Sequence, residues 1–270
     1  MSMVKAKKYL GQHFLTDRNI ARKISLCLEA KDYSNVLEIG PGTGILTAYL
    51  LERGFENFKV IEIDNEAVEY LRAEYRSLDI IEGDFLQLDM DSTFDDRLGI
   101  IGNFPYNISS QIFFKVLEYR DKVSELTCML QKEVADRLVS GPGSKVYGIL
   151  SVLLQAYYDI ELLFNVPAGV FSPPPKVQSA VIRLKRREEE LVYYDEKLFF
   201  KVVKITFNQR RKIIKNSLKP LVDTSGLDNM ILKKRPEQLG IDDFIELTRL
   251  VETILNRNNI SKKNSHGQDN

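Results

Sequence analysis

The sequence predicts an α/β protein in which a mostly parallel β-sheet is followed by a smaller helical domain. Three observations indicate this fold class. Short β-rich runs alternate with amphipathic helical patterns from Val36 to about Leu184, and the pattern becomes helical alone after residue 188. The composition is that of an ordinary globular protein, with 44% apolar and 28% charged residues. We therefore expect an α/β domain over residues 1–187 and a helical domain over residues 188–257.

The β-rich runs are short and bounded by turn residues or helical patterns. They are Val36–Ile39, Lys59–Ile63, Asp79–Glu82, Gly99–Gly102, Leu126–Leu130, Glu161–Val166 and Ser179–Leu184. Helical spacing lies between them near residues 45–53, 66–76, 109–119, 131–139 and 146–158. Alternation of this kind predicts βαβ units, and such sheets bind ligands at the carboxyl ends of their strands. Functional residues are therefore expected just after these runs.

The helical domain is predicted from three segments with helical spacing, residues 196–207, 210–218 and 242–256. A charge-dense stretch, 185–190, separates them from the last β-rich run. Residues 258–270 are mostly Asn, Ser and Lys, with Ile260 as the only apolar side chain. Because such a segment can bury too little surface to order itself, we expect a disordered tail.

Composition excludes several function classes. The 38 basic residues balance 38 acidic ones, and neither an apolar run of membrane-spanning length nor a signal peptide is present. We therefore expect a cytoplasmic protein with no membrane contact, and a monomer. Cys27 and Cys128 are the only cysteines, and His13 and His266 the only histidines. These are too few for a zinc site, so we expect no metal, and a Ser-His-Asp hydrolase is disfavoured.

Basic residues cluster near both ends of the chain, whereas residues 29–98 are strongly acidic. The clusters consist of Lys5, Lys7, Lys8, Arg183, Lys185, Arg186, Arg187, Arg210, Arg211, Lys212, Lys215 and residues 233–235. Such clusters are typical of solvated helix faces or of a surface that binds a polyanion such as RNA. Charge alone leaves both interpretations open.

A glycine turn follows the first β-rich run and begins a helical pattern. It reads Gly40-Pro41-Gly42-Thr43-Gly44. Its spacing matches neither the G-x-G-x-x-G dinucleotide fingerprint nor the Walker phosphate loop. The unpaired backbone N–H groups of such a turn can approach a ligand closely. The alternative is that the turn serves only tight strand-to-helix packing.

Two acidic residues end the next two runs, where this architecture binds an adenosine. Glu62 lies about twenty residues after the turn, the place where a carboxylate accepts the two ribose hydroxyls. Asp84 follows the third run and could accept the exocyclic amine of an adenine. This acidic set without a phosphate cradle suits an adenosine ligand that carries positive charge, such as S-adenosylmethionine. Ordinary surface carboxylates are the alternative.

The run 99–102 leads into Asn103-Phe104-Pro105-Tyr106, which suits methyl transfer to an adenine. The N6 amine is a poor nucleophile because its lone pair is delocalised into the ring. The Asn103 side-chain oxygen and the Phe104 carbonyl can hold both N–H groups and turn the lone pair toward a methyl donor. Pro105 stiffens the turn, and Tyr106 offers a face on which the base can stack. An ordinary Asn-Pro loop is the alternative.

Five ordered motifs together resemble the KsgA family of ribosomal RNA adenine dimethyltransferases. They occupy residues 9–15, 38–44, 103–108, 142–148 and 171–179, and read YLGQHFL, EIGPGTG, NFPYNI, PGSKVYG and FSPPPKVQS. The resemblance covers nearly all of residues 5–255. The chain departs from the usual pattern at His13, where the family often has Asn, and at Phe104, where it often has Leu.

The resemblance implies a Rossmann-like methyltransferase sheet that uses S-adenosylmethionine, with a helical C-terminal domain. It implies N6,N6-dimethylation of two adjacent adenosines in the 3′-terminal hairpin loop of 16S ribosomal RNA in an immature 30S subunit, and a role in 30S biogenesis. It assigns cofactor contacts to His13, Leu15, Gly40, Glu62, Asp84 and Asn103, to which the turn argument adds Gly42. It assigns the target-base pocket to Asn103, Phe104, Pro105, Tyr106 and Phe171.

Further substrate contacts are expected from a rigid aromatic ring and from basic residues. The three prolines after Phe171 hold its ring as the second wall of an adenine sandwich opposite Tyr106, unless Phe171 is a core residue. Lys145 lies in a glycine-rich loop that could close over RNA. Arg210 and Arg211 could lie along phosphates.

Two other functions remain open at this point. An Erm-type enzyme would use the same chemistry on an adenosine of 23S ribosomal RNA. A non-catalytic RNA-binding assembly factor would keep the fold alone. Residues 142–148 look more like the small-subunit branch, and the intact segment 103–106 disfavours a non-catalytic protein.

Overall fold

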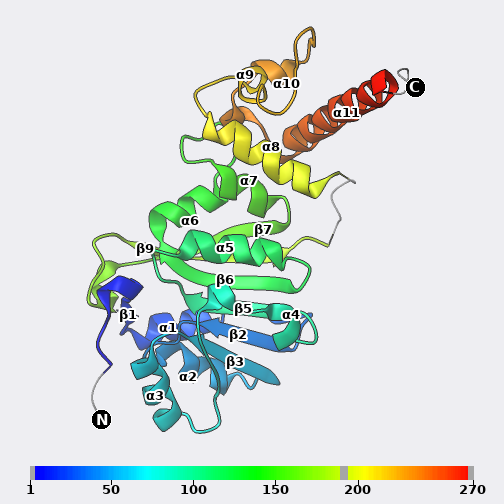
Figure 1. Cartoon of the computed structure of the whole chain (residues 1–270). Helices are drawn as coiled ribbons and strands as arrows, with labels where there is room; N and C mark the ends of the chain where they lie inside the picture. Colours follow the sequence, from blue (N-terminus) through cyan, green and yellow to red (C-terminus); the bar gives the residue numbers. More distant parts are fainter. Residues whose placement is uncertain (1–3, 189–193, 267–270) are drawn as a thin grey trace. The chain divides into compact units, whose positions relative to one another are not determined.

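The computed structural model describes residues 4–188 and 194–266. The chain divides into two compact units, shown with their elements in Figure 1. The α/β unit comprises Met1–Val139 and Tyr157–Arg187, and the helical unit comprises Ser140–Ala156 and Glu188–Asn270. Within the two described ranges, no helix has both the length and the apolar character of a membrane span.

A seven-stranded sheet forms the centre of the α/β unit, in the order β4-β3-β2-β5-β6-β9-β7. The strands are β2 (Asn35–Ile39), β3 (Asn57–Glu62), β4 (Asp79–Glu82), β5 (Leu98–Asn103), β6 (Val123–Gln131), β7 (Tyr158–Val166) and β9 (Ser179–Arg186). The first five in sequence pair in parallel, whereas β9 is antiparallel to both of its neighbours. Figure 1 shows β3, β2, β5 and β6 succeeding one another across the sheet. Each of the seven predicted runs overlaps one of these strands, so the predicted α/β class is confirmed.

Helices connect the strands of this unit. They are α1 (Arg18–Ser25), α2 (Ile45–Glu52), α3 (Asn65–Glu74), α4 (Met90–Thr93), α5 (Ser109–Glu118) and α6 (Lys132–Val139), with short 3-10 helices η1 (Lys8–Leu10), η2 (Phe85–Gln87) and η3 (Ala168–Val170). A separate antiparallel pair joins β1 (Phe14–Leu15) to β8 (Phe171–Ser172). The sequence pattern did not predict this pair, because two residues are too few to show a periodicity.

The central strands owe their position to apolar side chains on both faces. All five residues of β2 are buried, as expected for a parallel strand covered by helices on both sides. Val36 of β2 packs in one cluster with Leu46 of α2, Ile101 of β5 and Met129 of β6. This core fixes the ends of β2 and β5, and thereby the places from which the functional loops leave the sheet.

The helical unit contains the remaining helices of the described chain. They are α7 (Ile149–Gln155), α8 (Glu196–Asn208), α9 (Ile214–Ser217), α10 (Met230–Lys233), the 3-10 helix η4 (Pro236–Gln238) and α11 (Ile241–His266). An aromatic group forms part of its core: the Phe207 ring lies 6.0 Å from that of Tyr147 and stacks on Phe244 with 5.8 Å between centroids. The unit therefore has a core of its own.

Two features differ from the domain boundaries that the sequence suggested. Ser140–Ala156 lies in the helical unit, although we expected it within 1–187. Its Gly143 N–H donates to the Glu237 carbonyl at 2.6 Å, and Arg210 Nη2 donates to the Ser144 carbonyl at 3.2 Å. The expected tail 258–270 is helical through His266, as the end of α11. Its residues 267–270 lie outside the described residues, as does part of the expected boundary near 188.

Candidate active site

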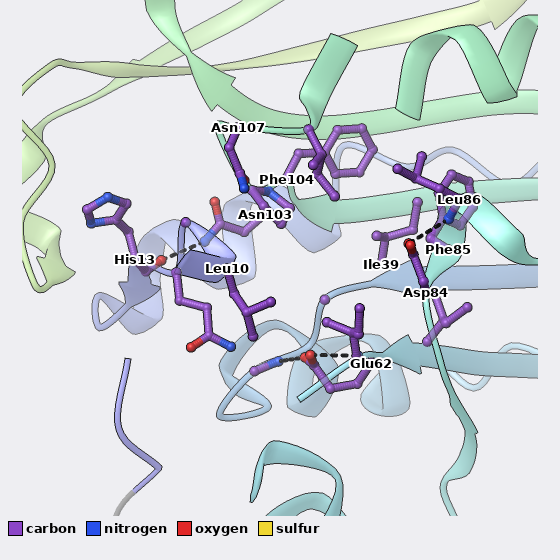
Figure 2. A pocket seen from close by; sticks show the side chains of 18 of the residues that line it. Leu10, His13, Ile39, Glu62, Asp84, Phe85, Leu86, Asn103, Phe104 and Asn107 are labelled. Atoms are coloured by element: carbon purple, nitrogen blue, oxygen red, sulfur yellow. Dashed lines mark hydrogen bonds between the residues drawn. The ribbon is translucent and has the colours of Figure 1, made fainter. Parts of the chain in front are cut away.

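A pocket lies at the carboxyl ends of β2, β3, β4 and β5, where a doubly wound sheet binds its ligand. Residues from five segments line it, within 10–14, 39–42, 61–63, 83–86 and 103–108. Figure 2 shows Asn103 and His13 together on one side of this pocket and Asp84 on the other. Segments far apart in the sequence thus meet at one edge of the sheet.

The glycine turn after β2 contributes one wall. Gly40 and Gly42 both have left-handed backbone conformations, with φ of +67° and +56°. A Cβ atom on Gly42 would lie 2.8 Å from the Phe14 ring, whereas a Cβ on Gly40 would meet nothing within 4 Å. Gly42 is therefore required by both conformation and packing, and Gly40 by conformation. The absent side chain at Gly40 leaves open space in the pocket wall.

Glu62 at the end of β3 is held by backbone amides. Its Oε2 accepts from Gly42 N–H at 3.0 Å, and its Oε1 accepts from the N–H groups of Ile63 and Asp64, each at 2.9 Å. Burial raises the pKa of Glu62, and these three hydrogen bonds oppose the rise. Oε2 accepts only one of these bonds and keeps a lone pair for a further donor such as a ribose hydroxyl.

Glu38 lies beneath the turn in β2 and is fully buried. Its Oε2 accepts from Thr47 Oγ1, in α2, at 2.7 Å. Burial raises the pKa of Glu38 to about 8, and the neighbouring Glu62 adds to the rise. At neutral pH the side chain is therefore mostly protonated. It joins the end of β2 to the first turns of α2 without placing a charge under the pocket.

Asp84 follows β4 on the opposite side. Its Oδ1 accepts from Leu86 N–H at 2.9 Å and so caps η2 (Figure 2). Among the described residues, no hydrogen bond is formed by its Oδ2, which is available to accept from an amino group. Asp84 and Glu62 thus present two acceptors in one pocket, whose wall also has open space at Gly40. These acceptors fit S-adenosylmethionine, whose adenosine carries an amine and two ribose hydroxyls.

Asn103 ends β5 with its side chain directed by the N-terminal segment. Its Nδ2 donates to the His13 carbonyl at 2.9 Å. Next along the chain, Phe104 N–H donates to the Met129 carbonyl at 2.9 Å, and the Phe104 ring is buried in edge contact with Phe113. In the part of the chain that the structure describes, no group donates to the Phe104 carbonyl. The segment therefore offers two acceptors, Asn103 Oδ1 and the Phe104 carbonyl oxygen.

Tyr106 is half-buried and does not line the pocket. Its hydroxyl shares a 2.6 Å hydrogen bond with Ser179 Oγ, and its ring centroid lies 5.3 Å from that of His13. The imidazole of His13 points away from the pocket (Figure 2). Its Nδ1–H donates to the Pro173 carbonyl at 2.7 Å. His13 therefore reaches Asn103 through its backbone carbonyl, so that another side chain at this position would leave the contact intact.

A family model described as "Ribosomal RNA adenine dimethylase" matches residues 3–261. The chain belongs to this family. The predicted enzyme class and the predicted cofactor are confirmed with it, because a ribosomal RNA adenine dimethylase is a methyltransferase that uses S-adenosylmethionine. The substrate class, ribosomal RNA, is confirmed as well.

Similar proteins cover almost the whole dimethylase chain. "Ribosomal RNA small subunit methyltransferase A" of Cytophaga hutchinsonii is 53% identical over 93% of this chain and 99% of its own. The protein of the same name from Parabacteroides distasonis is 52% identical over 95% and 98%. Among solved structures, a dimethyladenosine transferase from Plasmodium falciparum has a TM-score of 0.73 at 25% identity, over 87% of this chain and 96% of that one. The 23S rRNA methyltransferase ErmE has a TM-score of 0.65 at 26% identity, over 87% and 99%.

The structure of this dimethylase brings most predicted cofactor residues together. Six of the seven line the pocket: His13, Gly40, Gly42, Glu62, Asp84 and Asn103. Leu15 does not, because it pairs with Phe171 in the β1–β8 ladder and is buried in the core at 4% exposure. Leu15 therefore acts by anchoring the N-terminal segment and not by touching the pocket.

Phe171 also differs from its expected role. We expected its ring to form an adenine sandwich with Tyr106, but the ring is 4% exposed and belongs to the same core cluster as Leu15. The antiparallel pairing of β8 with β1 turns this side chain inward. The aromatic ring that the structure places beside Tyr106 is that of His13.

Lys145, Arg210 and Arg211, the basic residues expected to contact the substrate, lie in the helical unit. Arg210 connects to the loop that carries Lys145 through the carbonyl of Ser144. Sequence reasoning missed twelve pocket residues, namely Leu10, Gly11, Gln12, Phe14, Ile39, Ile61, Ile63, Gly83, Phe85, Leu86, Asn107 and Ile108. All of them lie within three positions of a predicted site residue, and seven of the twelve lie inside quoted motifs, so motif membership was the available signal.

Proposed function

We propose that this dimethylase methylates N6 of two adjacent adenosines in the 3′-terminal hairpin loop of 16S ribosomal RNA, giving N6,N6-dimethyladenosine. The substrate would be an immature 30S subunit in the cytoplasm, the enzyme would act as a monomer, and it would contribute to 30S biogenesis. The identity above 50% with small-subunit methyltransferases supports the choice of RNA. The observation that carries the chemistry is the position of Asn103, at the pocket and with its amide nitrogen already bonded.

Asn103 and Phe104 hold the target amine in this proposal. The oxygen of Asn103 accepts one N6–H, and the Phe104 carbonyl accepts the other. With both N–H groups held, the nitrogen lone pair is directed out of the plane of the base. When bound, S-adenosylmethionine supplies an electrophilic methyl group next to Asp84, Glu62 and Asn103. The residues then act chiefly by positioning, since the proton is lost only after the nitrogen is methylated.

Tyr106 and His13 are proposed to receive the base. The hydrogen bond to Ser179 fixes the Tyr106 ring, and Pro105 restricts the backbone that precedes it. A base that stacks on such a ring gains about 1 to 3 kcal/mol. Unpaired adenines in a hairpin loop reach such a site at lower cost than paired ones, because no base pair has to open.

The RNA around the target is proposed to contact basic residues of the helical unit. Lys145, Arg210 and Arg211 would neutralise phosphates there. Within the unit, Arg210 Nη2 holds the Ser144 carbonyl, next to Lys145. The loop that carries Lys145 and the residues after α8 are thus joined within the helical unit. Several basic residues held together can contact several phosphates of a folded RNA, whereas a single nucleotide needs only one such contact.

The substrate is tested by methyl transfer to purified ribosomal subunits. Subunits are taken from cells that lack this protein and are incubated with it and labelled S-adenosylmethionine. We expect label in the 3′-terminal hairpin of 16S RNA in 30S particles, as dimethyladenosine at two adjacent positions. Label in 23S RNA would instead favour an Erm-type enzyme. If no methyl group is transferred to either subunit, the proposal is overturned, and a non-catalytic assembly factor becomes the favoured function.

A further inference from the structure

The N-terminal segment Lys7–Leu15 passes along the pocket, and we call it the strap. Residues 10–14 of the strap all line the pocket, so it forms one continuous wall. The Phe14 ring lies against Gly42, and Gly11 packs against the side chain of Asn107. A cofactor in the pocket would therefore be enclosed only while the strap is held in place.

Asp64 holds the strap at one side through both of its oxygens. Lys7 Nζ lies 2.5 Å from Asp64 Oδ1, and Gln12 Nε2 donates to Asp64 Oδ2 at 2.9 Å. Lys7 and Gln12 are joined to each other, since Lys7 N–H donates to Gln12 Oε1 at 2.7 Å. Lys7 Nζ also lies 3.2 Å from Glu66. We call the contacts of Lys7 and Gln12 with Asp64 the clasp.

The clasp is centred on a buried carboxylate between β3 and α3. The Asp64 side chain is fully buried, although that of Lys7 is 24% exposed. Asp64 also caps α3 by accepting from Glu66 N–H at 3.0 Å. It follows the pocket residue Glu62 by two positions, and its own N–H donates to Glu62 Oε1. A buried charge of this kind is stable only while its partners remain, so the pair resists opening.

The strap contacts the proposed methyl-acceptor site at its other side. The His13 carbonyl accepts from Asn103 Nδ2 at 2.9 Å. Because a carbonyl oxygen can only accept, the nitrogen of the Asn103 amide must face the strap. Its oxygen must then point the other way, as an acceptor for an N6–H would have to. The strap thus fixes which way the Asn103 amide is turned.

We propose that Lys7, Gln12 and Asp64 are positioning residues that couple cofactor retention to the orientation of Asn103. By holding the strap, the clasp slows release of the cofactor. By holding the His13 carbonyl, the strap keeps Asn103 Oδ1 toward the acceptor. The second part rests on the proposed function of Asn103, whereas the first does not.

The test of retention compares two lysines that are adjacent in the sequence. Lys7→Met removes the ion pair of the clasp, and Lys8→Met removes the same charge at the next position. Binding of S-adenosylhomocysteine to the full chain is measured by calorimetry and stopped-flow, without RNA. Loss of one charge-assisted hydrogen bond predicts an affinity about tenfold weaker for Lys7→Met, mainly through faster dissociation. Lys8→Met should stay within about twofold of the wild type.

Two further variants keep the test independent of the lysine. Asp64→Asn retains the cap of α3 but loses the ion pair, and Gln12→Met removes one neutral contact. Both should speed dissociation of S-adenosylhomocysteine, and Asp64→Asn should do so with little change in melting temperature because it leaves no buried charge without a partner. Equal affinities and dissociation rates for Lys7→Met, Lys8→Met and the wild type would contradict the proposal that the clasp retains the cofactor.

The coupling to Asn103 is tested by turnover at saturating cofactor. If the strap orients Asn103, Lys7→Met lowers kcat for ribosomal particles even when the cofactor site is full. If kcat is unchanged while only the KM for the cofactor rises, the clasp retains the cofactor but does not orient Asn103. Should wild-type protein methylate no ribosomal particle, the proposed function fails, whereas the binding result still decides the clasp.

Discussion

At the scale of single residues, the acidic side chains near the pocket are of two kinds: some are placed to accept from a ligand, and others hold the protein together. Glu62 and Asp84 keep lone pairs directed at the pocket, although both also accept backbone N–H groups. Glu38 lies in the same motif as the glycine turn, yet it is buried beneath it, and among the described residues its side chain bonds only to Thr47. Neighbouring acidic residues therefore differ in role because Glu62 and Asp84 line the pocket and Glu38 does not.

Asn103→Ala should nearly abolish turnover while leaving cofactor affinity within a few fold. The variant removes the amide oxygen proposed to accept an N6–H, and misplacement of a reacting group costs on the order of 100-fold in rate. The measurements are methyl transfer to 30S particles and calorimetry with S-adenosylhomocysteine. Equal loss of turnover and of affinity would contradict an acceptor role for Asn103.

Glu38→Gln should change how stability depends on pH. The pKa of Glu38 is about 8 in the folded protein, above its ordinary value of 4.5. Between these values the unfolded chain releases the proton and the folded chain keeps it, so this group makes stability fall as pH rises. The variant lacks the effect, and its free energy of unfolding relative to wild type should increase from pH 5 to pH 8.

Chemical denaturation at several pH values measures this difference. Glu52→Gln, on the exposed end of α2, serves as the control and should follow the wild-type curve. A constant difference between Glu38→Gln and wild type across the range would show that Glu38 does not titrate there.

At the scale of elements, the turn between β2 and α2 is constrained from two directions. Its backbone is left-handed at Gly40, Gly42 and Gly44, and the Phe14 ring of the strap fills the place of a side chain at Gly42. The strap and the turn therefore form two adjoining walls of one pocket. A substitution in either is expected to change the position of the other.

Gly42→Ala should destabilise the protein and weaken cofactor binding. The left-handed conformation costs an alanine about 1 to 2 kcal/mol, and the contact with Phe14 adds a cost of about 1 to 3 kcal/mol. Gly54→Ala measures the conformational cost alone, because Gly54 has φ of +66° and an added Cβ there would meet nothing within 4 Å. Unfolding and calorimetry with S-adenosylhomocysteine would be compared. Similar losses in both variants would argue against the packing of Phe14 on the turn.

At the scale of the whole molecule, the pocket and the three basic residues predicted to contact RNA belong to different units. The pocket lies in the α/β unit, whereas Lys145, Arg210 and Arg211 lie in the helical unit. Ser140–Ala156 leaves the first unit and joins the second, so the chain passes between them more than once. An enzyme built this way can bind a folded RNA with one unit and one adenosine with the other.

RNA binding should therefore weaken steeply with salt, whereas binding of S-adenosylhomocysteine should change little. Each phosphate contact contributes a slope of roughly 0.7 to 0.9 in a plot of log affinity against log salt concentration. Lys145→Ala and Arg211→Ala should each lower the slope by about one contact. Lys197→Ala, an exposed lysine of α8 outside the basic clusters, serves as the control. An RNA affinity that is flat between low and moderate salt would remove the phosphate-contact interpretation.

Sequence alone determined the features that depend on neighbours along the chain. The seven β-rich runs, the glycine turn and the acidic ends of β3 and β4 follow from local patterns of apolar side chains and turn residues, because strands and turns are short-range structures. This pattern and the family resemblance predicted seven cofactor contacts, and six of these residues line the pocket. The buried positions of Leu15 and Phe171 could not be predicted in this way. A two-residue strand carries no periodic signal, and only the pairing of β1 with β8 turns these side chains inward.

Tertiary structure decided the contacts between segments that are distant in the chain. Lys7 and Asp64 are separated by 57 positions, and His13 and Asn103 by 90. No local pattern joins them, because their meeting depends on where the parallel strands end and how the strap lies across those ends. Whether Ser140–Ala156 belongs to the sheet or to the helices was decided in the same way, by hydrogen bonds to Arg210 and Glu237 that only the folded chain brings within reach.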